Sequence, residues 1–272
     1  MPVHIVSFQG ERGAYSEEAA AMFFGRSIGT KPCRTLREVF KSVEEGSAQY
    51  GIVPAENSLE GSINQTYDLL LEASLKISGE VKVRVRHCLL ALPGARLEDL
   101  NAVYSHPQAL AQCAGFLQKL DLETIPAYDT AGSAKMLIEK QLNAGAIASE
   151  RAAEIYGLQV LRKGIEDFPE NFTRFFVLAK NDDSPTGRDR TSIAFATTHT
   201  PGSLHRALGE LASRQINLTK IESRPIRGTP WEYNFFIDFE GHHNDVVVAE
   251  AINALQTSTA MLKILGSYPR AD

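Results

Sequence analysis

The chain contains 272 residues, of which 43% are hydrophobic and 22% are charged, and its formal net charge is -5. At about 150 residues per domain this length favours two compact domains, and the composition excludes disordered and collagen-like chains. A negative chain also lacks the basic surface that nucleic-acid binding requires. No stretch approaches the ~18 consecutive apolar residues of a membrane span, and the first residues resemble no secretion signal. We therefore expect a cytoplasmic protein that binds neither membranes nor nucleic acid.

The cysteines and histidines follow neither a disulfide framework nor a metal-site pattern. Cys33, Cys88 and Cys113 lie far apart and form no CxxC motif, which is typical of a reducing compartment. The seven histidines are scattered, and the adjacent His242 and His243 are poorly spaced to ligate one metal from a helix face. We expect no disulfide and no metal site.

A polar run containing proline and glycine, at residues 181–187, separates two strand-like segments and predicts a domain boundary. The charge changes at the same place. Residues from 190 onward carry eight basic and eight acidic side chains, whereas the first 189 residues carry 20 basic and 25 acidic ones. We predict a first domain at 1–181, a linker at 182–189 and a second domain at 190–272.

Strand-like and helix-like segments alternate in the first domain. Strands are expected at 4–8, 50–53, 102–105, 123–126, 146–148 and 175–179, and helices at 16–24, 36–43, 107–120 and 130–142. This alternation predicts an α/β domain with largely parallel sheets.

Two parts of this domain resemble each other. Thr35 opens a helix that leads, sixteen residues later, into Gly51, and Thr130 opens one that leads, fifteen residues later, into Gly145. Any two βα units share this much similarity, or the pattern indicates two similar lobes that face each other across a ligand-binding cleft.

The second domain has a βαββαβ pattern. Strands are expected at 191–197, 217–226, 232–239 and 261–267, helices at 202–214 and 245–256, and a turn at 227–230. This order predicts a ferredoxin-like antiparallel sheet with both helices on one face. A face or edge of such a sheet is usually left free for a partner.

Polar corners follow several strands of the first domain. The loop at 9–16 is neither a GxGxxG motif nor a P-loop, but free N–H groups, with Ser16 as N-cap, suit an anion or simply a well-capped helix. Similar corners lie at 54–61, 105–108 and 129–133. In α/β proteins ligands bind at such strand ends, and four polar corners exceed what helix capping needs.

Arg174 lies between aromatic residues at the start of a strand-like run. It is either an edge-strand arginine that extends off an apolar surface or a bidentate ligand of a carboxylate.

Together these motifs resemble the prephenate dehydratase family. The residues that carry the resemblance are Asn57, Ser58, Ser105, His106, Pro107, Gln108, Asp129, Thr130, Ala131, Asn171, Phe172, Thr173, Arg174 and Phe175. Glu222, Ser223, Arg224 and Pro225 resemble the ESRP motif of the ACT domain that follows in this family. The similarity extends from about residue 4 to residue 268, and the order and spacing of the motifs make it specific.

The resemblance implies a cytoplasmic carbon-oxygen lyase of phenylalanine biosynthesis that converts prephenate to phenylpyruvate, water and carbon dioxide without a cofactor. It implies a two-lobed, periplasmic-binding-protein-like catalytic domain with a cleft, and an ACT domain that binds L-phenylalanine as a feedback inhibitor. A homo-oligomer is expected, a dimer or tetramer through the ACT and catalytic domains. The alternatives are an arogenate dehydratase and a non-catalytic two-lobed protein that binds small anions.

The resemblance also implies catalytic roles for Thr173, Arg174 and Phe175. Thr173 would contact the leaving hydroxyl, and Arg174 would hold the side-chain carboxylate. A tight salt bridge to the ring carboxylate would stabilise the ground state and oppose decarboxylation, so neutral substrate-binding donors are expected around it. These are Asn57, Ser58, Ser105, Gln108, Thr130 and Ser133, with helix N-terminal N–H groups. His106 and Asn171 are two further residues that the resemblance implies in substrate binding.

The regulatory site is expected where two ACT domains pair. Residues 201–208 resemble the GALxxxL helix start of the family, with Ser203 where alanine is common. The residues implied in L-phenylalanine binding are Gly202, Ser203, Leu204, Asn217, Leu218, Glu222, Ser223, Arg224 and Pro225.

Overall fold

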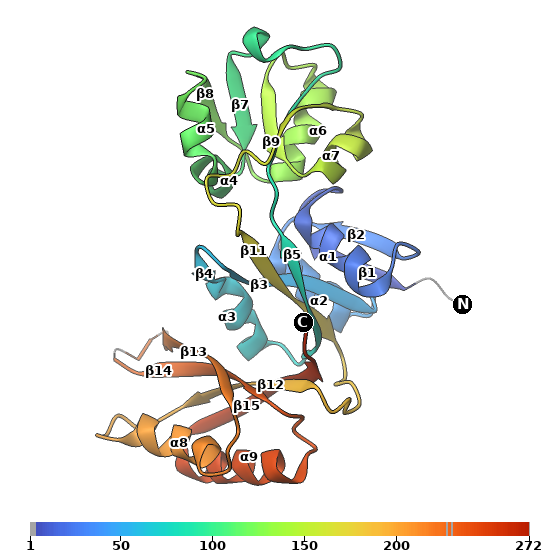
Figure 1. Cartoon of the computed structure of the whole chain (residues 1–272). Helices are drawn as coiled ribbons and strands as arrows, with labels where there is room; N and C mark the ends of the chain where they lie inside the picture. The colour runs from blue at the N-terminus through green and yellow to red at the C-terminus, as the bar shows by residue number, and fades with distance from the viewer. Residues whose placement is uncertain (1–3, 227, 230, 272) are drawn as a thin grey trace.

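The computed structural model describes residues 4–226, 228–229 and 231–271. Two α/β lobes and a smaller C-terminal domain are stacked along one axis (Figure 1). The lobe drawn mainly in blue, lobe A, lies between the green lobe B and the orange-red C-terminal domain. The turn expected at 227–230 includes positions 227 and 230, which lie outside the described residues.

Lobe A is built from residues 5–84 and 172–179. Its strands are β1 (Ile5–Gln9), β2 (Gly29–Cys33), β3 (Tyr50–Asn57), β4 (Gly61–Ser62), β5 (Lys76–Arg84) and β11 (Phe172–Ala179), and its helices are α1 (Tyr15–Phe24), α2 (Leu36–Glu44) and α3 (Asn64–Glu72). The sheet order is β2-β1-β3-β11-β5, with β4 paired to β3. Ser16 is not the N-cap predicted for α1, because the helix begins one residue earlier and Ala14 occupies the cap position.

Lobe B is built from residues 88–163. Its elements are β6 (Cys88–Ala91), a 3-10 turn (Leu97–Asp99), β7 (Ala102–Ser105), α4 (Pro107–Gln112), α5 (Ala114–Gln118), β8 (Glu123–Pro126), α6 (Thr130–Lys140), β9 (Gly145–Ala148), α7 (Glu150–Tyr156) and β10 (Gln159–Lys163). The sheet order is β10-β6-β9-β7-β8. The helix expected at 107–120 is interrupted at Cys113, whose φ of -114° and ψ of 16° are not helical.

The two lobes share one topology. In lobe A β1 lies between β2 and β3, and in lobe B β7 lies between β8 and β9; the next strand in each sheet, β11 beside β3 and β6 beside β9, is antiparallel. This confirms two similar lobes. The prediction of largely parallel sheets is only partly right, because β11, β6 and β10 run antiparallel to their neighbours. The chain crosses between the lobes twice, so β11 re-enters the sheet of lobe A from the opposite direction.

The C-terminal domain has the predicted βαββαβ order. It contains β12 (Asp189–Ala196), α8 (Ser203–Ala212), β13 (Leu218–Pro225), β14 (Tyr233–Glu240), α9 (Val246–Ser258) and β15 (Met261–Pro269). The antiparallel sheet order is β13-β14-β12-β15. Both helices cover one face, and the other face is turned toward lobe A (Figure 1).

One hydrophobic cluster joins lobe A to the C-terminal domain. Tyr67 and Phe176 of lobe A pack with Phe236 and Tyr268 of the C-terminal sheet, and all four side chains are buried. Burial of apolar area is the main stabilising contribution in such a contact, so the two units are docked together by a shared core.

The sequence analysis also made predictions about disulfides, metal sites and membrane spans. The three cysteines are free and buried. Over the part of the chain that the structure describes, no group of three or more His, Cys, Asp or Glu side chains could hold a metal ion. No helix formed by the described residues has the length and apolar character needed to cross a bilayer.

Gly266 allows the closest approach between the two docked units, and its substitution tests this contact. A Cβ at this position would lie 2.1 Å from the carbonyl oxygen of Ile77 in β5. Because that atom belongs to the backbone, Gly266→Ala should lower the free energy of unfolding by about 1–3 kcal/mol in urea denaturation. Gly209→Ala is the control, since nothing lies within 4 Å of its added methyl group and alanine favours the helix. Equal unfolding free energies for the two variants would contradict this packing.

Candidate functional site

A cavity of about 330 Å³ lies between the lobes, a volume that suits a small ligand. The cap or first-turn residues of five helices line it, together with strand residues of lobe A. These helix residues are Ala14, Tyr15 and Ser16 of α1, Leu36 of α2, Ile63 and Gln65 of α3, His106, Gln108 and Ala109 of α4, and Asp129 and Thr130 of α6. This cavity is called the cleft below.

The cleft is suited to an anion although its wall carries no arginine or lysine among the described residues. Helix N-termini present unpaired N–H groups and the positive end of the helix dipole. An adjoining hollow shares Gln9, Tyr128 and Asp129 with the cleft and adds the cations Arg34 and Lys135. Favourable contacts for an anion therefore come from helix ends at the centre and from Arg34 at one side, where Lys135 is already paired with Glu11 (3.1 Å).

A β-bulge brings β3 and β11 into position at the cleft. In the register, Thr173 is opposite Asn57 whereas Phe175 is opposite Pro54, so β3 has one extra residue. Residues three apart in a regular strand face opposite sides, but this bulge lets both Pro54 and Asn57 line the cleft with Thr173 and Phe175. Bulges commonly redirect side chains in this way beside functional sites.

Asn57 holds the Thr173 hydroxyl. Its Oδ1 accepts the backbone N–H groups of Leu59 (3.0 Å) and Glu60 (3.2 Å), which fixes the orientation of the amide. Its Nδ2 then donates to Asn171 Oδ1 (2.8 Å) and to Thr173 Oγ1 (3.1 Å). A threonine oxygen that accepts a hydrogen bond still has its own proton to donate, and that proton is available to a ligand in the cleft.

The network continues from Asn171 to a buried histidine. Asn171 Nδ2 and His87 Nε2 each lie 3.0 Å from Gln112 Oε1, while Gln112 Nε2 donates to Glu60. Because this amide oxygen only accepts, His87 carries a proton on Nε2. The other ring nitrogen, Nδ1, lies 3.2 Å from the hydroxyl of Tyr15. A continuous chain of hydrogen bonds therefore runs from Thr173 to His87, while the hydroxyl of Tyr15 donates to the Arg86 carbonyl (2.7 Å).

His87 and Asn171 lie in the two connections between the lobes, which run side by side in Figure 1. The Val85 N–H donates to the Asn171 carbonyl (2.8 Å), and the Ile165 N–H donates to the His87 carbonyl (3.1 Å). The connections are thus bonded to each other as well as to the cleft. A change in the angle between the lobes would alter the same network that holds Thr173.

Four titratable groups of the cleft have shifted pKa values: burial raises the pKa of Tyr15 and of Tyr128, and His87 and Asp129 are shifted as follows. Burial lowers the pKa of His87 below its ordinary 6.5, against the hydrogen bond that it donates to Gln112, which raises it. Burial raises the pKa of Asp129 above its ordinary 3.8, against the backbone N–H of Gly132 that lowers it. These two shifts favour the neutral form: the Asp129 shift disfavours a negative charge facing an anionic ligand, whereas the His87 shift removes a positive charge from the wall.

Six of the side chains predicted from the sequence for catalysis and substrate binding line the cleft. They are Asn57, His106, Gln108, Thr130, Thr173 and Phe175. Asn171 lies behind this wall, fully buried, and acts on the cleft through Asn57.

Three predicted serines do not line the cleft, and the expectation that they bind a ligand is corrected. The hydroxyl of Ser105 donates to the Ile147 carbonyl (2.7 Å), and that of Ser133 donates to the Asp129 carbonyl (2.8 Å). Ser58 donates to the Glu170 carbonyl (3.1 Å). These hydroxyls satisfy buried or turn backbone groups and shape the cleft without entering it.

The prediction that Arg174 holds a ligand carboxylate is wrong. Successive side chains of a strand point to opposite faces, so Arg174 points away from the face that presents Thr173. Its guanidinium lies against the C-terminal domain and donates to Glu80 (2.5 Å), Asp238 (2.6 Å) and Tyr268 (2.9 Å).

Five further residues with polar side chains line the cleft although the sequence analysis did not name them as catalytic or substrate-binding residues. They are Tyr15, His87, Gln112, Tyr128 and Asp129. Two of them belong to corners that the sequence does single out, at residues 9–16 and 129–133. No local sequence pattern marks His87, which follows β5, or Gln112, which is the last residue of α4.

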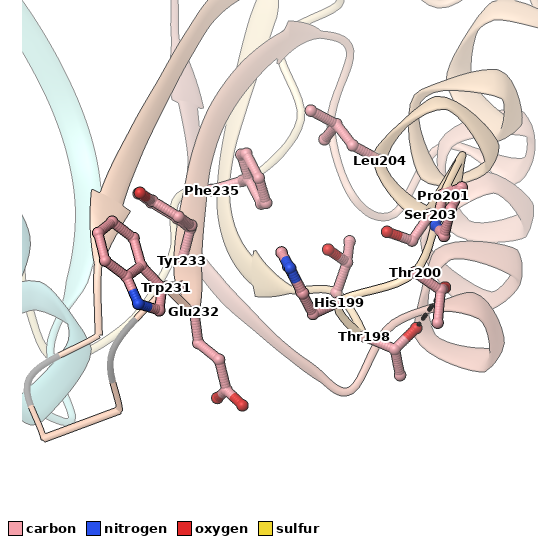
Figure 2. A pocket seen from close by; sticks show the side chains of 11 residues that line it. Thr198, His199, Thr200, Pro201, Ser203, Leu204, Trp231, Glu232, Tyr233 and Phe235 are labelled. Atoms are coloured by element: carbon pink, nitrogen blue, oxygen red, sulfur yellow. Dashed lines mark hydrogen bonds between the residues drawn. The ribbon is translucent and has the colours of Figure 1, made fainter.

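The C-terminal domain contains a second cavity, of about 370 Å³. Figure 2 shows Trp231, Tyr233 and Phe235 on one side of it and Ser203 and Leu204 at the start of α8 on the other. Only the last two belong to the predicted regulatory residues. Gly202 precedes them in a left-handed conformation, with φ of 79°.

The other predicted regulatory residues lie on or just before β13, an edge strand. Glu222 and Arg224 face lobe A, where Ser62 donates to Glu222 (3.0 Å) and Arg224 contacts Asp68 (3.0 Å). Asn217, Leu218, Ser223 and Pro225 lie outside both cavities described above. One chain does not bring the predicted set into a single pocket.

Sequence models of two families match the chain: prephenate dehydratase over residues 6–183 and the ACT domain over residues 193–256. The bifunctional chorismate mutase/prephenate dehydratase of Aquifex aeolicus is 44% identical over 98% of this chain and 74% of that protein. Arogenate dehydratase/prephenate dehydratase 2 of Arabidopsis thaliana is 47% identical over 97% of this chain and 72% of that protein.

Solved structures show the same similarity. Prephenate dehydratase from Arthrobacter aurescens, in complex with L-Phe, superposes with a TM-score of 0.90 at 33% identity, covering 98% of this chain and 90% of that chain. GqqA, described as a novel type of quorum-quenching acylase, superposes with a TM-score of 0.89 at 36% identity, covering 98% of both chains.

The buried neutral state of His87 predicts a pH dependence of stability. Unfolding exposes a histidine of ordinary pKa, which binds a proton that the folded ring resists. Stability should therefore fall as the pH drops from 6.5 toward the lowered folded pKa, by at most about 1.4 kcal/mol per pH unit from this group. Urea denaturation at pH 7.5 and at lower pH should show a smaller loss on acidification in His87→Gln than in the wild type. The same slope in both proteins would contradict a neutral buried His87.

Proposed function

The chain belongs to the prephenate dehydratase family, and we propose that its cleft converts prephenate to phenylpyruvate, carbon dioxide and water. The observation that carries the proposal is the Thr173 hydroxyl, which accepts a hydrogen bond from Asn57 and has its proton free toward a cavity walled by helix N-termini. No cofactor enters this reaction.

The charge distribution around the cleft suits the two carboxylates of prephenate. The ring carboxylate must leave as neutral carbon dioxide, so a cation against it would stabilise the reactant and slow its loss. Neutral helix ends at the centre of the cleft meet this condition. The side-chain carboxylate persists in the product, and Arg34 of the adjoining hollow takes the role that the sequence gave to Arg174.

The chemistry requires stabilisation of the departing hydroxyl group. When the bond between the ring and the carboxylate breaks, the electron pair of that bond moves into the ring, which becomes aromatic as the hydroxyl group leaves. The hydroxyl group takes up one proton and is released as water. Thr173 donates a hydrogen bond to this oxygen as negative charge develops on it. The hydrogen bond from Asn57 strengthens Thr173 as a donor and fixes the orientation of its hydroxyl group. Phe175 presents an apolar surface to the ring of the substrate.

Thr173→Ala tests this role against Thr173→Ser, which keeps the hydroxyl. We expect the alanine variant to lose about 10²- to 10³-fold in kcat with little change in KM, the usual effect of removing a transition-state donor, and the serine variant to retain most activity. The assay follows phenylpyruvate from prephenate, with parallel arms for phenylalanine from arogenate and for hydrolysis of an N-acyl amide. No turnover of prephenate by the wild type would refute the proposed function, and equal effects on kcat and KM would refute the role of Thr173.

We further propose that L-phenylalanine binds at the ACT domain and inhibits the enzyme. The apolar side chains of Trp231, Tyr233 and Phe235 in the second cavity suit a phenyl ring, and Ser203 lies at the adjacent helix start (Figure 2). Trp231 and Ile221 are exposed by 75% and 45% on the same domain. Exposed apolar groups of this kind favour pairing with a second copy of the chain. In our proposal, this pairing brings the β13 edge of each copy to the L-phenylalanine site.

Ser203→Leu fills this cavity and tests the regulatory proposal. The variant should bind L-phenylalanine at least tenfold more weakly, because the larger side chain occupies ligand space, while its turnover without effector stays near that of the wild type. Isothermal titration with L-phenylalanine and inhibition curves measure the two effects. Inhibition unchanged by Ser203→Leu would place the effector elsewhere.

A further inference from the structure

A buried cluster of charged and hydroxyl side chains connects β11 to the C-terminal sheet. It consists of Arg174 and Glu80 from lobe A and Arg190, Ser192, Asp238 and Tyr268 from the C-terminal domain. This set is called the interface cluster. Its carboxylates are almost inaccessible, since the side chain of Glu80 is 0% exposed and that of Asp238 is 4% exposed.

Like the contact between Glu80 and Arg190, Arg174 connects the two units. Its Nε donates to Glu80 of its own sheet, whereas Nη1 and Nη2 donate to Asp238 and Tyr268 of the C-terminal domain. Its side chain is 10% exposed, and it also lies over the ring of Phe176, 4.8 Å from the centroid. The residue directly before it in the strand is Thr173.

The C-terminal partners of Arg174 are themselves held in place. Ser192 donates to Asp238 Oδ1 (2.6 Å), and its oxygen lies 2.6 Å from the hydroxyl of Tyr268. Arg190 donates to both carboxylate oxygens of Glu80 (2.7 Å). A movement of the C-terminal sheet relative to lobe A therefore cannot be absorbed by one flexible side chain.

A second arrangement is available to Arg174 if Asp238 moves away. A buried guanidinium that loses a partner must find another, because an unpaired buried charge is strongly unfavourable. Glu56 lies 3.9 Å from its Nη1 and is at present bonded to Lys220 of β13. Glu56 immediately precedes Asn57, so this rearrangement would act on the residues that hold the Thr173 hydroxyl.

We infer that Arg174 is a positioning residue that makes the placement of Thr173 depend on the docked ACT domain through Asp238 and Tyr268. The inference rests on the proposed function, since Thr173 is the group whose placement matters. While Asp238 holds Arg174, this end of β11 is clamped, and Thr173 and Asn57 keep the geometry that directs a proton into the cleft. When the ACT sheet shifts, Arg174 turns toward Glu56 and the clamp is lost.

Two variants remove the connection without touching the cleft. Asp238→Asn keeps the shape of the side chain and removes its charge, and Tyr268→Phe removes only the hydroxyl. We expect a fall in kcat of about 10- to 100-fold for Asp238→Asn, the scale of a misplacement of about 1 Å, and a smaller fall for Tyr268→Phe, with KM within about twofold of the wild type in both. Thermal unfolding and circular dichroism establish that each protein is folded, and the milder variant decides the matter where Asp238→Asn does not fold.

Asp68→Asn is the matched control, because Asp68 and Arg224 form another ion pair between lobe A and the C-terminal domain, at 3.0 Å and away from β11. Its kcat without effector should stay within about twofold of the wild type. Arg174→Gln completes a double-mutant cycle with Asp238→Asn. If Asp238 acts through Arg174, the double variant loses no more kcat than Arg174→Gln alone.

Each outcome bears on the inference. A fall in kcat confined to the variants of the interface cluster, with non-additive losses in the cycle, supports it. Wild-type kcat in folded Asp238→Asn and Tyr268→Phe, or additive losses, overturns it while leaving the proposed function intact. An equal fall in Asp68→Asn also overturns it, because docking in general would then be the cause. Absence of prephenate turnover by the wild type overturns the proposed function and this inference together.

Discussion

β11 supplies side chains to two different sites because consecutive residues of a strand point to opposite faces. Thr173 and Phe175 line the cleft, while Arg174 and Phe176 contact the C-terminal domain. The strand pairs with β3 on one side and β5 on the other. Movement of β11 toward either face would break these backbone hydrogen bonds, which together hold it in register. The cleft and the C-terminal domain thus receive adjacent side chains of one short segment.

The same alternation explains which part of the site the sequence predicts and which part it does not. Period two alone places Thr173 and Phe175 on one face, and it equally excludes Arg174 from that face. The prediction for Arg174 assumed that neighbouring residues of the motif all face the ligand. Because these residues begin a strand, alternate side chains face opposite sides. The bulge that lets Pro54 and Asn57 share a wall has no such signal, because it is a property of the pairing register between two strands whose paired residues are 116 to 127 positions apart.

The fold itself is more predictable than the site. Alternating strands and helices, and polar corners after the strands, lead to two lobes because the ends of parallel strands meet at one edge of a sheet. His87 and Gln112 escape this reasoning. They meet because α4 ends beside the first connection between the lobes, which gives a 3.0 Å contact between residues 25 positions apart. Contacts created by topology leave little trace in a local pattern of residues.

Net charge is a poor guide to the sign of a binding site, and this chain shows why. Its formal charge is -5, yet the cleft suits an anion, because interactions at a few ångströms are set by local dipoles and not by distant, screened surface charges. Helix ends give a milder field than a guanidinium would. For a carboxylate that must depart as a neutral molecule this is an advantage, since a strong ion pair would be lost on the way to the transition state. In the role that we propose for Thr173, a hydroxyl donor has the opposite property, because its hydrogen bond becomes stronger as negative charge develops on the leaving oxygen.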